Sequence, residues 1–547
     1  MLYKYNAHFL IHCPAYVIVL LSFLFIPSIG IAQTQEEPAK TKVYLLHSDV
    51  LRFNKKTNPD AQIVDGNVVF RHDSLYMYCD SAYFYSKTNS LEAFGHIKMN
   101  QGDTLFLYGK HLFYDGNSQI AMVRGDVQMI HKNTVLTTDS LNYDRVYNLG
   151  YYFDGGELTD QDNVLTSNWG QYSPATKVAV FNHEVHLTNP KFVLASDTLR
   201  YSTQTKIATI LGPSTIDNGK NHIYSELGYY DTQVEQAHLL NRSVLYNGGK
   251  QLTGDSLFYD RKVGYGKAFS NVEMNDTIGK SLFMGNYCYY DEKHENVMAT
   301  ERAVVVDYSQ GDSLFLHADT LRMNTYNINT DSTYKLIRAY HKVRAYRHDL
   351  QASCDSLVFN SKDSCMTFYK DPVVWNQNQQ LLGEEIRVYM NDSTIDWAHI
   401  INQALAVEKK DSINYNQVSG KEMKAFFQQK QIRRSLVTGN VQVAFYLEEK
   451  NKGIIAFNSS ETSILDLYLK DRQLEKAVMK PQTNGTTYPM DQIPEEKRFL
   501  SNFVWLDYMR PKSKEDIFNW VGKKADDKLK QSKRSNKIPT NHQIILK

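Results

Sequence analysis

The stretch DSLNYD at residues 139–144 decides the fold, because near copies of it recur at regular intervals along the chain. Clear copies are DTLRYS at 197–202, DSLFYD at 255–260 and DSLVFN at 355–360. The aromatic residue of each copy, or the residue that replaces it, is an anchor, and successive anchors lie 29 to 36 residues apart. The anchors are Phe84, Tyr114, Tyr143, Tyr172, Tyr201, Tyr230, Tyr259, Tyr290, Met323, Phe359 and Val388. Such a period predicts a repeat architecture.

Each copy has the pattern of a half-buried β-strand. The anchor and the residue two positions before it are apolar or glycine in nearly every copy, as in Leu141-Asn142-Tyr143. A period of two places these residues on one face of a strand. A second strand pattern lies about half a period away, as in GHIKM at 95–99 and GDVQM at 125–129. Each unit of about 30 residues is therefore expected to hold two strands of about five residues, with no room for a helix.

A two-strand unit cannot bury its own apolar face, so neighbouring units are expected to stack into one elongated, all-β body. The polar residue four positions before each anchor, such as Asp139, is expected at a turn where the chain enters the strand. The unpaired strands at the two ends of the stack are expected to remain open to pairing.

Composition excludes some classes of protein. The chain has 547 residues, of which 42% are hydrophobic and 22% charged, so most of it can bury a core. Its 61 Lys and Arg residues and 60 Asp and Glu residues give a net charge of +1, which argues against nucleic acid as a partner.

The first 32 residues have the pattern of a secretory signal peptide. Lys4 precedes the apolar run AYVIVLLSFLFI at 15–26, and small residues lead up to Ala32. Cleavage is expected between Ala32 and Gln33. The alternative is an N-terminal membrane anchor, but the run is shorter than the roughly 20 residues that span a bilayer. The mature protein is therefore expected to be exported.

The cysteines fit neither a disulfide framework nor a zinc site. Four remain after residue 32, namely Cys79, Cys288, Cys354 and Cys365, and they form no C-x-x-C pair. A bridge between Cys354 and Cys365 is the one disulfide that the spacing suggests. No metal, cofactor or catalytic residue is expected.

The repeat fades after residue 447. We expect residues 448–522 to form a mixed region that contains a short helix, with Ser513 as its N-cap. Residues 523–547 are polar and basic, and we expect this tail to be disordered.

The repeats resemble those of the OstA (organic solvent tolerance) family. The residues that carry the resemblance are Asp65-Gly66-Asn67-Val68, Ala93-Phe94-Gly95-His96-Ile97, Val123-Arg124-Gly125-Asp126-Val127 and Thr137-Thr138-Asp139-Ser140-Leu141-Asn142-Tyr143. The family includes the periplasmic bridge protein of lipopolysaccharide transport and the N-terminal domain of the outer-membrane translocon. The resemblance covers residues 43–447 and implies an OstA-like region over 33–447, either as one long body or as two tandem domains, without the translocon's membrane barrel.

That resemblance implies a folded-over antiparallel β-jellyroll, open along one side, whose apolar groove carries the acyl chains of lipid A. The residues expected to line the groove are Val68, Phe70, Ile97, Met99, Val127, Met129, Leu141, Tyr143, Leu199, Tyr201, Leu257 and Tyr259. It also implies a periplasmic protein, with outer-membrane association as a further option. The implied partners are lipopolysaccharide, other transport components that pair with its strand edges, and further copies bound head to tail.

Two other functions fit the periodicity. One is a repeat-built envelope scaffold or adhesin without a small ligand. The other is a polysaccharide-active enzyme with paired carboxylates. The enzyme is disfavoured because eleven equivalent positions carry similar polar residues, whereas a catalytic pair occurs once.

Overall fold

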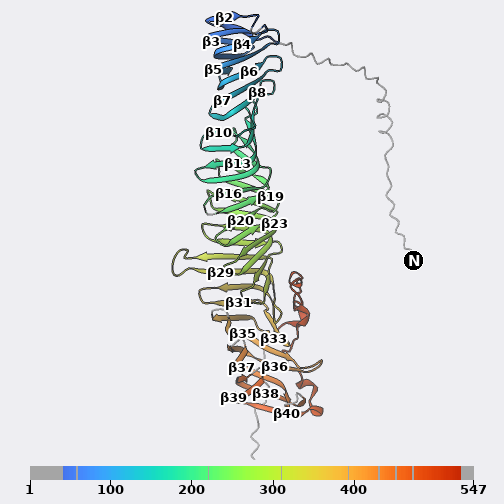
Figure 1. The fold of residues 1–547 in the computed structure, drawn as a ribbon. Helices are drawn as coiled ribbons and strands as arrows, with labels where there is room; N and C mark the ends of the chain where they lie inside the picture. Colours follow the sequence, from blue (N-terminus) through green and yellow to red (C-terminus); the bar gives the residue numbers. More distant parts are fainter. Residues whose placement is uncertain are drawn as a thin grey trace, which may run out of the picture.

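The strands stack along one axis into a long, narrow body (Figure 1). The computed structural model describes residues 41–530, apart from 57–58, 220, 310, 392–393, 429–430, 450–452 and 471–472. The signal peptide with Ala32 and Gln33, and the tail beyond residue 530, lie outside the described residues. The N-terminal strands occupy one end of the body and the C-terminal strands the other. The expected all-β, elongated architecture is confirmed.

The described residues form forty strands in one sheet. The first half comprises β1 (Tyr44–His47), β2 (Val50–Phe53), β3 (Gln62–His72), β4 (Leu75–Tyr85), β5 (Ser90–Gln101), β6 (Leu105–Asp115), β7 (Ile120–His131), β8 (Thr134–Asp144), β9 (Leu149–Tyr152), β10 (Gly156–Asp160), β11 (Asn163–Ser167), β12 (Trp169–Ser173), β13 (Val178–Asn189), β14 (Phe192–Ser202), β15 (Ile207–Ile210), β16 (Ser214–Asp217), β17 (His222–Ser225), β18 (Leu227–Asp231), β19 (Gln236–Leu240) and β20 (Val244–Asn247). The second half comprises β21 (Lys250–Thr253), β22 (Ser256–Asp260), β23 (Tyr265–Asp276), β24 (Ser281–Asp291), β25 (Asn296–Thr300), β26 (Val304–Asp307), β27 (Leu314–His317), β28 (Thr320–Tyr326), β29 (Tyr334–Tyr346), β30 (Leu350–Asn360), β31 (Cys365–Tyr369), β32 (Val373–Asn376), β33 (Gln379–Leu382), β34 (Glu385–Asn391), β35 (Thr394–Lys409), β36 (Tyr415–Gln428), β37 (Gln431–Glu448), β38 (Ile454–Lys470), β39 (Gln473–Lys480) and β40 (Asn484–Pro489). All the pairings are antiparallel.

Each repeat is built from two long, bent strands rather than two short ones. In β7, the bend lies at Gly125 and Asp126, whose φ angles are +79° and +47°. The ladder with β8 skips these two residues and resumes beyond them. A bulge of this kind turns a strand without ending it. The expected strands of about five residues therefore correspond to the two halves of one bent strand, such as the 12-residue β7.

The bend recurs along the body. Consecutive residues with positive φ occupy it at Gly66–Asn67, Gly95–His96, Gly125–Asp126, His183–Glu184, Ser270–Asn271, His341–Lys342, Asn402–Gln403 and Gly439–Asn440. In other units the long strand is replaced by two short ones, such as β15 and β16, which pair with opposite halves of β14.

In units with an unbroken long strand, the repeated polar residue lies at the bend, in the middle of that strand. In units with two short strands, it lies directly before the second of them, as Asp255 does before β22. Asp80 is in the middle of β4, and its Oδ2 lies 2.7 Å from Nδ1 of His96 in the neighbouring bend. Asp255 accepts a hydrogen bond of 2.7 Å from the Asn271 side chain in the same way. The short carboxylate therefore supports left-handed backbone in the adjacent strand. The expectation of a position at the strand entry is confirmed for units with two short strands, as at Asp255 and Asp319. It is wrong for long strands such as β4, because a bent strand has its turn-like residues in its middle.

Because every unit bends at the same place, the strand halves form two facing walls. One wall, which we call the Leu wall, lies between the bend and short turns such as His72–Leu75. Its inward row is in register across the strands and is apolar at every position from Phe70 to Val443. The row begins with Phe70, Met77, Met99, Leu107, Met129, Leu136, Leu158, Leu165, Leu187 and Leu194.

The opposite wall, which we call the Tyr wall, lies between the bend and longer turns such as Tyr85–Ser90. Its inward row alternates large and small residues on successive strands. The row runs through Tyr114, Ala121, Tyr143, Gly150, Tyr172, Ala179, Tyr201, Ala208, Tyr230, Ala237, Tyr259, Gly266 and Tyr290. The small residue beside each tyrosine leaves room for its ring, which explains why one anchor appears per repeat and not one per strand.

The sheet continues past the boundary expected at residue 447. β37 pairs with β38 along almost their whole lengths, and β38 pairs with β39 and β40. The motif fades because polar residues such as Ser460 and Thr462 replace the inward apolar ones, but both are buried and the ladder persists. The β body therefore ends at Pro489.

Among the described residues beyond β40, the chain forms only single 3-10 turns, and no helix is longer than one of these turns. They are η1 (Met490–Gln492), η2 (Glu495–Lys497), η3 (Asp507–Met509), η4 (Asp516–Phe518) and η5 (Ala525–Asp527). The Oγ of Ser513 accepts hydrogen bonds from the backbone N–H groups of Glu515 and Asp516, but the N-cap of η4 is Glu515, so Ser513 is not the N-cap that was expected. The expected helix is reduced to the single turn η4, whose Ile517 packs into a cluster on the β body.

Candidate functional site

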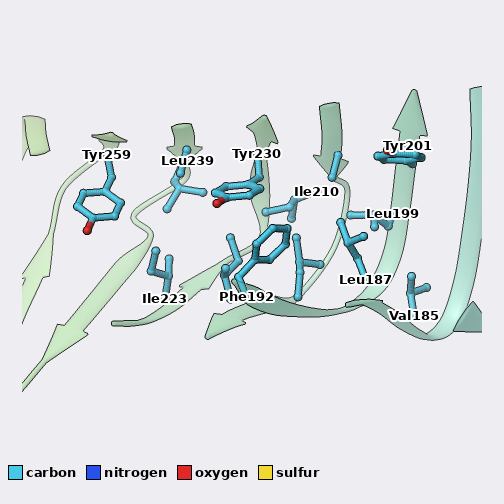
Figure 2. Close-up of a cluster of buried hydrophobic side chains, with 14 of the residues drawn as sticks. Val185, Leu187, Phe192, Leu199, Tyr201, Ile210, Ile223, Tyr230, Leu239 and Tyr259 are labelled. Atoms are coloured by element: carbon cyan, nitrogen blue, oxygen red, sulfur yellow. The ribbon is translucent and has the colours of Figure 1, made fainter. Parts of the chain in front are cut away.

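The interior between the two walls contains all twelve residues that were expected to line a groove. Each is buried, and Tyr259 is the most exposed at 9%. All twelve belong to one continuous apolar cluster. Figure 2 shows the arrangement around the middle of the body: Leu199, Tyr201 and Tyr259 project from the Tyr wall, and Leu187 and Phe192 face them from the Leu wall.

The interior is closely packed. Beside Tyr143 there is a cavity of about 10 Å³, lined by Leu75, Met99, Gln101, Leu105, Leu107, Met129 and Tyr143. This is the space of roughly one water molecule. An acyl chain could enter only if the two walls moved apart.

The mouth between the walls is closed by hydrogen bonds from the tyrosines, which we call the tyrosine seam. The Tyr114 hydroxyl lies 2.6 Å from Nδ1 of His72, and the Tyr172 hydroxyl lies 2.8 Å from Nδ1 of His131. The Tyr143 hydroxyl donates to Oε1 of Gln101 over 3.2 Å. In each pair the partner lies 41 or 42 residues earlier, at the end of the opposite wall.

The expectation of a trough open along one side is therefore wrong for this structure. A tyrosine is long enough to span the mouth, and its hydroxyl needs a partner when it is buried. The polar residue at the end of each Leu-wall strand supplies that partner. These residues are missed by reading only the apolar pattern, although they recur with the repeat, at 72, 101, 131 and 160.

The seam contains a buried ion pair at its middle. Nζ of Lys206 lies 2.5 Å from Oδ2 of Asp160, and their side chains are 10% and 1% exposed. The Tyr201 hydroxyl donates to the same carboxylate oxygen over 2.9 Å. Asn163 donates from its side-chain amide to the Tyr201 hydroxyl. A charge buried so deeply is stable only while all of these partners are present.

Burial keeps the tyrosine and histidine side chains of the seam uncharged at neutral pH. It raises the pKa of Tyr143 to about 12, and it raises the pKa of Tyr201 further. Burial also lowers the pKa of His72 and of His131 below the ordinary value of a histidine. The tyrosine hydroxyls therefore keep their protons and can donate. Each neutral imidazole has one nitrogen that donates a hydrogen bond and one that accepts.

Acidification is expected to loosen the seam. Below pH ~6.5 the unfolded chain takes up protons at His72 and His131, whereas the folded chain does so only at lower pH. Their contribution to stability is therefore complete above pH ~6.5 and is lost as the pH falls through the folded pKa values. Between pH 7.5 and 5.0, hydrogen exchange of β3–β8 amides, corrected for intrinsic rates, should accelerate. His131→Gln should weaken this dependence around β7, and exchange that slows on acidification would contradict it.

The four cysteines of the described residues are free and buried. The bridge expected between Cys354 and Cys365 is contradicted: Cys365 on β31 pairs with Asn360, which is six residues along β30 from Cys354. At about 3.3 Å per residue this is roughly 20 Å, far beyond disulfide reach. A separation of eleven residues suits a hairpin, but here the hairpin turn lies between Asn360 and Cys365.

No group of three or more His, Cys, Asp or Glu side chains in the described ranges could hold a metal ion. In the same ranges, no helix is long and apolar enough to cross a membrane.

The comparison with known families covers the first part of this two-walled body. The family model described as OstA-like protein matches residues 40–197. Residues 40–197 are OstA-like. The family belongs to the cell envelope, and no curated protein matches the chain.

The match ends before Leu199, Tyr201, Leu257 and Tyr259, yet the structure continues the same pattern there. The Leu-wall row stays apolar and the Tyr-wall row keeps its alternation across residue 197. The two-walled arrangement therefore extends well beyond the matched residues.

Proposed function

We propose that this protein binds the acyl chains of lipopolysaccharide between its two walls and carries them across the periplasm towards the outer membrane. The observation that carries this proposal is the apolar interior, which runs without interruption from Phe70 to Val443. The OstA-like match over residues 40–197 supports it. We also propose that the role is not catalytic, since the repeated carboxylates support strand bends.

The proposal requires the walls to separate, and the energies allow this. Burying an acyl chain contributes about 0.8 kcal/mol per CH₂ group. Each hydrogen bond of the seam contributes about 1 kcal/mol. A chain of about a dozen methylenes can therefore offset the opening of several seam bonds and part of the wall contacts. The seam would then act as a lateral entrance that closes when no lipid is bound.

The two ends of the body suit assembly with other transport components. At one end β1 and β2 pair only with β3, and at the other β39 and β40 pair only with β38, among the described residues. Each end therefore offers an unpaired edge for strand addition. We propose that lipopolysaccharide-transport partners, or further copies bound head to tail, extend the walls at these edges into a continuous path.

Photo-crosslinking tests the proposal. Crosslinking residues at Tyr143, Tyr201 and Tyr259 are expected to capture lipopolysaccharide in cells at least tenfold more than crosslinkers at Asn142, Arg200 and Phe258. The latter three are their neighbours in the chain and lie on the outer face of the Tyr wall. Mass spectrometry of the adducts would identify the lipid.

A scaffold or adhesin without a small ligand is the second candidate, and the closely packed interior favours it. Equal labelling at the inward and outward positions, or labelling at neither, would favour the scaffold and refute lipid transport.

A further inference from the structure

The chain beyond β40 runs back along the outer face of the Leu wall, where it forms what we call the strap, residues 493–529 (Figure 1). Two buried glutamines hold it by its backbone. Gln417 donates to the carbonyl of Arg498 and accepts from the N–H of Leu500, both over 2.8 Å. Gln380 makes the same pair of bonds to Val504 and Leu506, over 2.9 and 2.8 Å. Both glutamines bind backbone groups, so this binding requires no particular side chain in the strap.

The glutamines belong to one row on the outer face of the Leu wall, which we call the track. Neighbouring members are in register on adjacent strands. Amide side chains alternate with apolar ones from Ala444 to Tyr346, and two further amides, Asn275 and Gln251, end the row. The row is Ala444, Gln417, Val407, Gln380, Trp375, Gln351, Tyr346, Phe315, Val306, Leu282, Asn275 and Gln251. Leu506 packs with Trp375 and Val407, and Ile517 packs with Val306 further along.

The strap leaves the track at Phe518, but the track continues. Beyond this point lies an open cleft of about 310 Å³, lined by Gln251, Thr253, Glu273, Asn275, Leu282 and Tyr308. Leu282 touches the apolar cluster of Ile517 at one side of the cleft. Gln251 holds the repeat position that Gln380 and Gln417 hold under the strap. The cleft is therefore an extension of an interface that already binds another segment of this chain through its backbone.

The end of the chain has the properties that this cleft requires. Residues 531–547 read QSKRSNKIPTNHQIILK, with four Lys and Arg residues, no acidic residue and the apolar run Ile544–Leu546. The cleft carries the carboxylate of Glu273 and the apolar surface of Leu282.

The tail is also long enough to reach the cleft. Leu529 packs beside Trp375. From Trp375 to Gln251 there are seven strand steps along the track, roughly 34 Å at ~4.8 Å per step. Fifteen extended residues span about 50 Å.

We propose that residues 540–547 of the same chain dock in this cleft in extended form, with Gln251 bound to their backbone and Ile544–Leu546 against Leu282. Residues 540–547 then cover the part of the track that the strap leaves open. The outer face of the Leu wall is covered by these two segments of the same chain from β38 to β21. This inference stands independently of lipid transport.

Disulfide trapping in the full-length protein tests it. The four native cysteines of the described chain are buried. Gln251→Cys combined with Ile545→Cys should form an intramolecular bridge on mild oxidation, seen as a linked peptide in a monomer. Thr159→Cys with Ile545→Cys is the matched control, because Thr159 lies on the same outer face but far from the cleft. Its yield should be at least fivefold lower.

A further variant tests the contact itself. Adding Leu282→Asp to the Gln251→Cys/Ile545→Cys chain should lower the yield at least fivefold, while circular dichroism remains that of the parent. Equal yields at positions 251 and 159, no bridge at position 251, or bridges formed only between two molecules would each overturn the proposal. The last result would assign the cleft to a second copy.

Discussion

Leu199→Asp is expected to lower the free energy of unfolding of the surrounding units by more than about 4 kcal/mol, the range reached when a charge is buried without a partner. Leu199 is completely buried, between Phe181 on β13 and Ile210 on β15. The substitution removes apolar contacts on both sides and places a carboxylate where no cation is in reach. Urea unfolding, followed by circular dichroism and by hydrogen exchange of β13–β15 amides, would measure the effect.

The neighbouring position provides the control. Arg200 is exposed on the outer face of the same strand, so Arg200→Asp should change the free energy of unfolding by less than about 0.5 kcal/mol. Similar losses in the two variants would contradict the assignment of Leu199 to the interior. Lipid capture should be compared only in Leu199 variants that keep the parent circular dichroism, for which Leu199→Ala is the milder choice.

Lys206→Met is expected to cost about 3–5 kcal/mol, the usual effect of removing one partner from a buried ion pair. The Asp160 carboxylate would keep the Tyr201 hydroxyl, at 2.9 Å, but would lose the one cation that lies within 4 Å of it in the part of the chain that the structure describes. The methionine keeps most of the aliphatic length of lysine, so the loss reports on the charge. Hydrogen exchange of β10, β14 and β15 should show the largest change.

A second substitution should reverse the effect. Asp160→Asn in the Lys206→Met background removes the unpaired charge while keeping an amide beside Tyr201, and it should recover most of the lost stability. If the double variant is no more stable than Lys206→Met, the pair is not the cause. This comparison also probes the entrance, because under the lipid proposal a loosened seam should raise crosslinking at Tyr201 rather than lower it.

Taken together, the two variants separate the interior from its mouth. Leu199 lies deep between the walls, and Lys206 lies at the turn that closes over them. Loss of lipid labelling with Leu199→Ala but not with Lys206→Met would place the lipid between the walls.

The sequence by itself determined the all-β repeat and which residues face inward. Leu141 and Tyr143 could be placed in the interior because a strand turns alternate side chains to opposite faces, whatever surrounds it. The same rule placed Asn142 outside. Because this property is local, it survives from one repeat to the next even where the family match ends at residue 197.

Only the tertiary structure decided how the walls meet and what covers them. The contacts of Tyr172 with His131 and of Tyr201 with Asp160 join residues 41 apart, and this offset depends on how far the two walls are staggered along the axis. The bond of Gln380 to the backbone of Leu506 joins residues 126 apart and involves no side chain of the strap. Neither kind of contact leaves a pattern in the local sequence. Hydrogen bonds between the walls, and from the wall to the strap backbone, depend on which distant segments the fold brings together.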